Sequence, residues 1–290
     1  MDPPIFIIGS PRSGTTLLRL MLTCHRNIMI PPECGFAVWL YDNNKTWNIE
    51  QDTDILGRWV EDLMGCHKIE TWEMEPRALL TFLQRRRPSS YPEAVSAVYE
   101  FYGKARGRTF SRWGDKNNFH LDYVETIKSM FPRAFFIHLV RDGRDVACSY
   151  RGLNATTMDS EYAPRLPNAI REIASVWKAD VAGVRKAFES FGREQVSEIR
   201  YEALVAAPEA TLETLCRFLG ETYDEGMLSY PAINRDEQLE PAEFLQWKEK
   251  TLQPPMPLDQ PAYLTQLSAK EIEDFEEIAG DVLRDYGYIT

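Results

Sequence analysis

The sequence predicts a single α/β domain in which a central parallel sheet is flanked by helices. Short apolar segments alternate along the chain with longer segments of helical periodicity, a pattern typical of strand–helix–strand units. The first apolar segment ends in a glycine-bounded loop that leads directly into a helix. Because the chain contains no internal repeat or low-complexity tract, we expect residues 1–290 to form one domain.

The elements follow from local patterns. Apolar strands are predicted at residues 5–9, which should be buried, and at residues 134–140. Residues 195–199 are a short strand candidate. Helices are predicted at residues 14–24, 54–65, 76–86, 92–105, 122–130, 170–191, 208–219 and 269–286, with a further helix after Asp142. Several helix ends carry their own signals: Pro208 opens one helix, Gly220 closes it, and Ser268 begins a capping box.

Composition limits the classes of function. The formal net charge is −11, which disfavours general binding to nucleic acid. The five cysteines form no C-x-x-C pair, as expected in a reducing compartment. No apolar run approaches the ~20 residues of a membrane span, and the first strand begins too close to Met1 for a signal peptide to precede it. These features predict a cytoplasmic location.

The loop at residues 9–14 has the spacing of a phosphate-binding loop. Gly9 and Gly14 are separated by four residues and followed by two threonines, close to the G-x-x-x-x-G-K-[ST] pattern of nucleotide triphosphate sites. Thr15 replaces the lysine of that pattern, and the positive charge lies inside the loop, at Arg12. Loop N–H groups and the helix N-terminus favour an anion. The change of charge position argues for a nucleotide-like ligand and against hydrolysis of ATP or GTP.

A second anion site is predicted after the strand at 134–140. Arg141 leaves the strand end, and Ser149 lies on the next helix, where it can face back towards Arg141. A guanidinium fork and a hydroxyl can together hold one phosphate. The alternative is a helix-capping turn with surface ion pairs. Since the carboxyl ends of parallel strands meet at one edge, we expect Gly9, Arg141 and Tyr201 to gather there.

Together the two segments resemble the sulfotransferases that use 3′-phosphoadenosine 5′-phosphosulfate (PAPS). Residues 11–16 resemble the loop for the 5′-phosphosulfate, and residues 141–149 resemble the site for the 3′-phosphate. Residues 200–202 resemble a segment near the adenine. The most similar branch contains tyrosylprotein sulfotransferases and bacterial members. The resemblance implies the P-loop nucleotide-kinase-like sulfotransferase fold.

The resemblance also implies catalytic residues. Alignment without gaps from the loop places Glu33 at the position of a base, and residues 113–118 place Lys116 over the sulfonate, together with Arg12. Burial would raise the pKa of Glu33, whereas nearby cations would lower it. His120 is a rival base. The alternatives are a solvated glutamate for Glu33 and a surface lysine for Lys116.

Three further segments are assigned to ligand contacts. Residues 233–262 are expected to cover the cofactor with Trp247 and Lys248, and the aromatic-rich residues 36–112 are expected to form an acceptor-side insert. Residues 152–167 are a candidate acceptor gate. The orientation of Arg19, towards solvent or acceptor, is left open. The full expected cofactor-binding set is Ser10, Pro11, Arg12, Ser13, Gly14, Thr15, Thr16, Arg141, Ser149, Tyr201, Trp247 and Lys248.

The expected reaction is in-line transfer of a sulfonate from PAPS to a hydroxyl acceptor, with 3′-phosphoadenosine 5′-phosphate (PAP) as product and no metal ion. The expected acceptor is a small molecule, a lipid or a glycan. A tyrosyl peptide is the first alternative, although the net charge of −11 suits an acidic peptide poorly. The phosphate-binding loop at residues 9–14 is also compatible with a small-molecule kinase or with a non-catalytic nucleotide-binding module.

Overall fold

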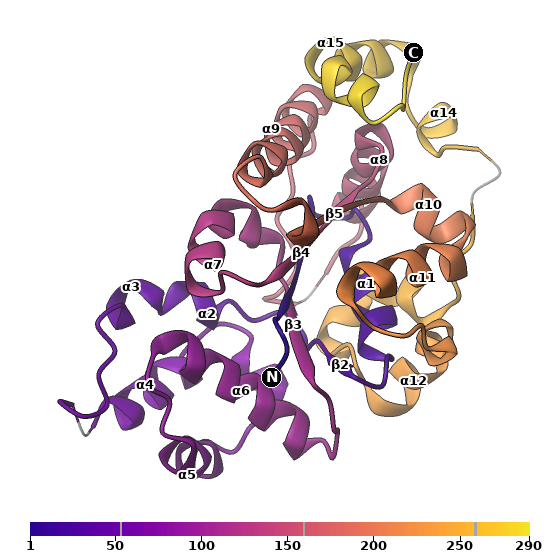
Figure 1. Cartoon of the computed structure of the whole chain (residues 1–290). Helices are drawn as coiled ribbons and strands as arrows, with labels where there is room; N and C mark the ends of the chain where they lie inside the picture. Colours follow the sequence, from indigo (N-terminus) through magenta and orange to yellow (C-terminus); the bar gives the residue numbers. More distant parts are fainter. Residues whose placement is uncertain (53, 159, 258–259) are drawn as a thin grey trace.

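A five-stranded parallel sheet forms the centre of the protein, as seen in a computed structural model (Figure 1). The structure describes residues 1–52, 54–158, 160–257 and 260–290. The strands are β1 (Ile5–Ile8), β2 (Ile28–Met29), β3 (Arg112–Lys116), β4 (Phe135–Val140) and β5 (Val196–Arg200). Their order is β2-β3-β1-β4-β5, and every pair of neighbours is parallel.

The helices follow the predicted segments closely. Over the described residues they are α1 (Thr15–Thr23), α2 (Phe36–Trp39), α3 (Tyr41–Asn44), α4 (Ile55–Met64), α5 (Pro76–Arg86), α6 (Tyr91–Ala105), α7 (Val124–Met130), α8 (Gly143–Asn154), α9 (Ile170–Phe188), α10 (Tyr201–Ala206), α11 (Pro208–Leu219), α12 (Tyr230–Glu237), α13 (Leu245–Lys248), α14 (Tyr263–Gln266) and α15 (Ala269–Asp285). The predicted capping box at Ser268 is present. The short helices α2, α3, α10, α12, α13 and α14 were not predicted.

Strands β1, β4 and β5 were predicted, whereas β2 and β3 were not. β2 has only two residues, too few for a pattern to show. β3 contains arginine, aspartate and lysine, yet all of its residues are buried. Arg112 is neutralised there by Glu221 and donates to the carbonyls of Pro3 and Leu219. Charge partners from distant segments therefore let a polar sequence occupy an internal strand.

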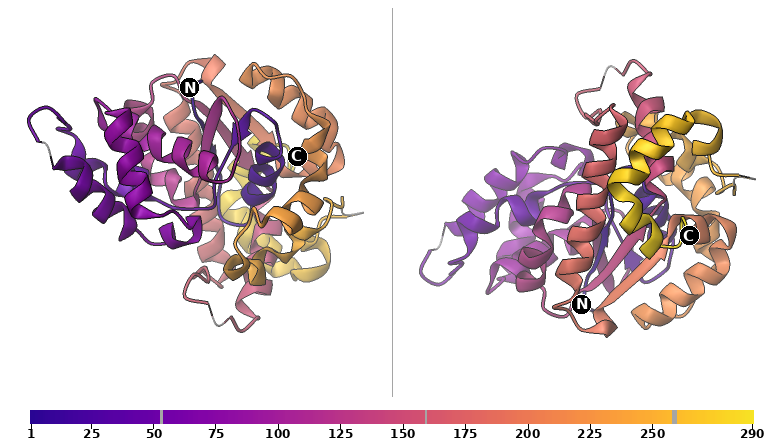
Figure 2. Two further views of the ribbon diagram at one scale, coloured as in Figure 1. Left: turned by 90° about the horizontal axis from the view of Figure 1, so that it is seen from below. Right: turned by 90° about the horizontal axis from the view of Figure 1, so that it is seen from above.

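The two faces of the sheet are covered by different helices (Figures 1 and 2). Phe6, Trp113 and Phe136 point to one face and share a core with α4–α7 and the end of α9. Ile7 and Leu139 point to the other face and share a core with α1, α10 and α11. A third apolar cluster joins α8, α9 and α15 beyond β4.

Most of the aromatic rings of residues 36–112 belong to the core, as expected. Trp47, Trp59, Trp72, Tyr91, Tyr99 and Tyr102 are buried. Tyr99 stacks on Trp113 of β3 with ring centroids 4.1 Å apart, which fixes α6 against the sheet. Trp39 differs, because 39% of its surface is exposed. Within the described parts of the chain, no helix has the length and apolarity needed to cross a membrane.

Gly9 allows the loop after β1 to lie directly against β4. A Cβ atom at this position would come within 2.5 Å of the carbonyl oxygen of Leu139, a backbone atom that cannot swing aside. We therefore expect Gly9→Ala to lower the free energy of unfolding by about 1–3 kcal/mol, the usual cost of overpacking.

The matched control is Gly183→Ala, in the interior of α9, where nothing lies within 4 Å of the added atom. This substitution is expected to stabilise the protein by about 0.4–1 kcal/mol. Urea denaturation of both variants measures the difference. Equal effects would contradict the close approach at Gly9.

Candidate active site

The carboxyl ends of the parallel strands bring the predicted site residues to one edge of the sheet. Lys116 is the last residue of β3 and pairs with Ile7 of β1. Gly9 follows Ile7 by two residues, so it lies next to the end of β3. Arg141 follows β4, and Tyr201 follows β5. The expectation that Gly9, Arg141 and Tyr201 would gather is therefore confirmed, as sheet geometry requires.

The loop after β1 has the backbone of an anion cradle. Arg12 and Gly14 both adopt positive φ, 67° and 95°. The Tyr201 ring packs so closely on Gly14 that a Cβ atom there would overlap it. α1 begins at Thr15, so its first N–H groups have no partner within the helix. Ser10 and Ser13 are buried, and Pro11 is half-buried. The loop at residues 9–14 and the first turn of α1 thus place hydroxyl and N–H groups together, where they can bind an anion.

Two arginines lie side by side at this loop. Arg12 Nε donates to Ser149 Oγ at 3.1 Å, and Arg141 donates to the carbonyl oxygen of Arg12 at 3.2 Å. The Arg141 guanidinium also lies 4.6 Å from the centre of the Tyr201 ring. Burial, together with the charge of Arg141, lowers the pKa of Arg12. The two cations are half-buried, and the carboxylate paired with them is that of Asp145, 3.9 Å from Arg141. Adjacent cations with so little counter-charge are suited to an anionic ligand.

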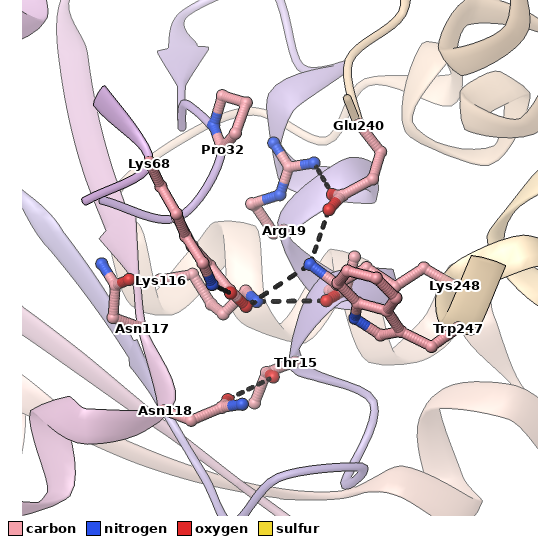
Figure 3. A network of polar contacts seen from close by, with 12 residues as sticks. Thr15, Arg19, Pro32, Lys68, Lys116, Asn117, Asn118, Glu240, Trp247 and Lys248 are labelled. Atoms are coloured by element: carbon pink, nitrogen blue, oxygen red, sulfur yellow. Dashed lines mark hydrogen bonds and ion pairs between the residues drawn. The ribbon is translucent and has the colours of Figure 1, made fainter. Parts of the chain in front are cut away.

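Three lysines from different segments meet at one carboxylate, that of Glu33 (Figure 3). Lys116 Nζ contacts Glu33 Oε1 and lies 3.1 Å from Thr16 Oγ1 at the start of α1. Lys68 Nζ donates to Glu33 Oε2 at 3.0 Å, and Lys248 Nζ lies 3.5 Å from Oε1. The cluster carries an excess of positive charge directly beside the cradle.

Distant side chains hold the Glu33 segment in place. Trp72 Nε1 donates to the carbonyl of Pro32 at 3.1 Å, and Asn117 Nδ2 donates to the carbonyl of Cys34 at 3.2 Å. Asn117 is oriented in turn by Asp115 Oδ1, 2.7 Å away. The carbonyls on both sides of Glu33 are therefore anchored, so its carboxylate cannot turn away from the lysines without breaking these contacts.

The charges shift one another's pKa values. Burial by itself would raise the pKa of Glu33, but Lys116, Lys248 and Lys68 more than offset this and hold it well below its usual value. Burial lowers the pKa of Lys116 to about 8, even though Glu33 favours its charged form. Glu33 is therefore ionised at neutral pH, and the pKa of Lys116 lies closer to neutrality than that of an ordinary lysine.

Lys248 is also paired with a second carboxylate, that of Glu240, which in turn contacts Arg19. Lys248 Nζ is 2.6 Å from Glu240 Oε1, and the other oxygen of Glu240 contacts Arg19 of α1. Arg19 is 1% exposed, so it does not point to solvent. Neither Lys68 nor Glu240 was predicted from the sequence to belong to the site. No local motif marks either residue, and only their meeting at Glu33 and Lys248 reveals them.

His120, the rival base, lies in a different environment. Its ring is fully buried against Phe6 and Phe119, with centroids 5.8 and 5.2 Å away. Burial, followed by the charge of Lys116, lowers its pKa to about 3. The His120 ring is thus fully buried and its neutral form is favoured, whereas the side chain of Glu33 is 12% exposed.

The C-terminal segment reaches the cradle. The carbonyl of Trp247 accepts from Arg12 Nη1 at 2.9 Å, and Phe244 lies beneath both Lys68 and Lys248 at about 5 Å from each ammonium. Tyr162, from the candidate gate, packs on Phe244 with ring centroids 5.3 Å apart. Residue 53 of the 36–112 range, residue 159 of the gate and residues 258–259 of the covering segment lie outside the described residues.

The residues present suit a phosphorylated nucleotide. Ser13 Oγ and Arg141 Nε are buried without a hydrogen-bond partner in the described part of the chain, and both belong to the predicted anion sites. Thr15 Oγ1 lies 3.4 Å from Asn118 Oδ1 at the mouth of the cradle. In the four described ranges no group of three or more His, Cys, Asp or Glu side chains is placed to hold a metal ion.

Comparison with known proteins agrees with the geometry. The family model described as "Sulfotransferase family" matches residues 3–225. Protein-tyrosine sulfotransferase A of Caenorhabditis elegans is 24% identical over 80% of this chain and 53% of its own length. The omega-hydroxy-beta-dihydromenaquinone-9 sulfotransferase Stf3 of Mycobacterium bovis is 27% identical over 81% of this chain and 68% of its own length. The chain thus spans about half the length of the nematode relative.

Solved structures show the same fold. The sulfotransferase domain of the Synechococcus PCC 7002 olefin synthase superimposes with a TM-score of 0.54 at 22% identity, covering 96% of each chain. Mouse sulfotransferase SULT7A1, solved in complex with PAP, superimposes with a TM-score of 0.53 at 14% identity, covering 99% of this chain and 89% of its own. The P-loop-like sulfotransferase fold expected from the sequence is therefore confirmed.

We expect Lys116→Met to stabilise the protein at pH 7 by about 1–3 kcal/mol, because the variant removes a buried cation from a crowded cluster. The pH dependence has a definite sign. The folded chain releases the Lys116 proton near pH 8 and an unfolded chain near 10.5, so wild-type stability rises with pH between these values. The variant lacks this rise.

Urea denaturation at pH 7 and pH 9.5 measures both effects. Lys104→Met, which removes an exposed lysine of α6, serves as the control and should change stability by less than about 0.5 kcal/mol. A destabilised Lys116→Met protein with the wild-type pH dependence would show that Lys116 is not strained by its burial.

Proposed function

This chain belongs to the sulfotransferase family, and on that premise we propose that it transfers a sulfonate group from PAPS to a hydroxyl acceptor. One observation carries the proposal: Lys116 contacts both the Glu33 carboxylate and Thr16 at the first turn of α1. A base and a cation thus adjoin the anion cradle. Positioning and electrostatics supply most of the catalysis in transfers of this type.

In this proposal Glu33 accepts the proton of the acceptor hydroxyl. PAPS supplies the sulfonate and a stable leaving group when bound. Lys116 and Arg12 stabilise the negative charge that develops at the cradle. Before the donor binds, Lys68 and Lys248 help to keep the Glu33 carboxylate ionised. The anionic groups of a bound donor would compete with Glu33 for the same lysines. With less positive charge close to its carboxylate, Glu33 would have a higher pKa and would accept a proton more readily. Binding of the donor would thereby strengthen the base.

The nucleotide is assigned to the neighbouring residues. Arg141 and Ser149 would hold the 3′-phosphate that distinguishes PAPS from ATP, and Tyr201 would lie near the adenine. Support comes from the pairing of Arg12 with Ser149 and from the Arg141 Nε, which lacks a partner in the described residues. Trp247 lies against the same loop and would cover the nucleotide.

The acceptor is proposed to be a small molecule, a lipid or a glycan. Trp39, partly exposed, stacks on Phe119 at 5.0 Å and lies against Gly35, two residues beyond Glu33. A flat apolar surface beside the base suits a ring or the face of a sugar. A tyrosyl peptide remains the alternative because several relatives are named protein-tyrosine sulfotransferases. A screen of both acceptor classes with one donor separates them.

We expect tight binding of PAP and little binding of magnesium ATP in calorimetric titrations. Arg141→Ala should weaken PAP binding about tenfold or more, since a charged hydrogen bond to phosphate is lost. The variant should bind adenosine 5′-phosphosulfate, which has no 3′-phosphate, as the wild type does. An equal loss for both ligands would refute the assignment of Arg141, and preference of the wild type for ATP would favour a small-molecule kinase.

Glu33→Gln is expected to lower kcat by a factor of about 10²–10⁴, the usual contribution of a general base. Its affinity for PAP should not fall, because the substitution removes a negative charge from the anion site. Transfer of radiolabelled sulfonate and PAP titration provide the two measurements. His120→Asn is the comparison: a larger loss of kcat in this variant than in Glu33→Gln would reverse the choice of base.

A further inference from the structure

The family match ends at residue 225, but the segment beyond it supplies two buried charges to the site. Lys248 ends α13, and Glu240 lies in the connection between α12 and α13. Glu240 is 2% exposed and Lys248 is 7% exposed. Figure 3 shows both of them beside α1, joined to Arg19 and to the lysine cluster by a continuous series of ion pairs.

Glu240 is held in place independently of Lys248. Its backbone N–H donates to Asn234 Oδ1 at 2.8 Å, and one carboxylate oxygen contacts Arg19. Arg19 is fixed in turn by the carbonyls of Ile30 and Leu239, at 3.0 and 2.9 Å. A carboxylate fixed on one side in this way presents its second oxygen in a defined position.

Lys248 is divided between two carboxylates, and the division is unequal. Its ammonium lies 2.6 Å from Glu240 but 3.5 Å from Glu33. Without Glu240, the three lysines at Glu33 would share a single carboxylate. Mutual repulsion would then favour loss of the Lys116 proton, or a full ion pair between Lys248 and Glu33. Either outcome would weaken the proposed chemistry.

We propose that Glu240 is a positioning residue that holds the Lys248 ammonium close to itself and partly withdrawn from Glu33. This inference rests on the proposed function, because it concerns the same base and the same cations. Arg19, on α1, holds the Glu240 carboxylate in the position that this role requires. Glu240 is not expected to touch either substrate, so its effect on catalysis must pass through Lys248 and through the Lys116 that both of them face.

Glu240→Gln is the direct test, since it keeps the size of the side chain and removes its charge. We expect kcat to fall about tenfold or more, with the KM for the donor changed by less than about threefold. The alkaline limb of kcat/KM should move to lower pH by about half a unit or more. The groups that face Lys116 are Glu33, Thr16, Lys248, Glu240, Asp115 and His120, and among them only Glu240 is altered.

A measurement without turnover separates this inference from the proposed function. PAP affinity should also decline at a lower pH in Glu240→Gln than in the wild type, because Lys116 loses the carboxylate charge that favours its protonated form. If the wild type binds PAP but transfers no sulfonate, the proposed function fails and this titration still tests Glu240. An unchanged pH dependence of binding would overturn the inference.

Two further variants control for a merely structural role. Glu221→Gln removes another buried carboxylate, paired with Arg112 at 3.2 Å at the opposite end of β3. It should lower stability without moving either pH profile. The second control is a double-mutant cycle: in a Lys248→Met background, Glu240→Gln should cause little further loss of kcat. Additive losses, or an alkaline shift in Glu221→Gln equal to that in Glu240→Gln, would overturn the inference.

Discussion

The contact between the Glu33 carboxylate and Lys116 is the interaction on which the arrangement of the site depends. A buried lysine is costly unless it is paired, and Lys116 is 1% exposed at the end of an internal strand. Glu33 supplies the necessary charge only because the carbonyls of Pro32 and Cys34, on either side of it, are anchored by Trp72 and Asn117. The aromatic core of residues 36–112 therefore serves the site as well as stability.

Positive charges outnumber negative charges around Glu33, and this excess favours the binding of an anionic ligand. One carboxylate faces three ammonium groups, with Arg12 and Arg141 nearby, in a chain whose formal net charge is −11. An anionic ligand completes the charge balance, so binding energy is available at the point where the reaction is proposed to occur. Burial, and to a smaller extent the charge of Lys248, lowers the pKa of Lys116 to about 8, a sign that stability has been lost locally in favour of function.

The C-terminal segment shows how a chain adds to a shared fold. The sheet, the cradle, Glu33, Lys116 and Arg141 lie within the part that matches the family. Glu240, Trp247 and Lys248 lie beyond it, yet they contact Arg19, Arg12 and Glu33. The contacts with Arg19 and Glu33 are ionic, whereas the contact with Arg12 is a hydrogen bond to the backbone carbonyl of Trp247. The segment therefore adds charges to the site and also contacts the loop after β1.

The sequence by itself determined the elements whose signals are local. An apolar run predicts β1 and β4, and residues 195–199 were a short strand candidate at the place of β5. The spacing of Gly9, Gly14 and Thr15 predicts a cradle before α1. From there, strand ends predict where Arg141 and Tyr201 lie, and the family resemblance adds Glu33 and Lys116. The tertiary structure alone decided that the polar residues 112–116 form an internal strand, since Glu221 and Glu33 supply their counter-charges from far along the chain. It also decided that Lys68, Glu240 and Arg19 belong to the site. A buried charge is stabilised by partners in space, and no pattern within one segment of sequence records which partners those are.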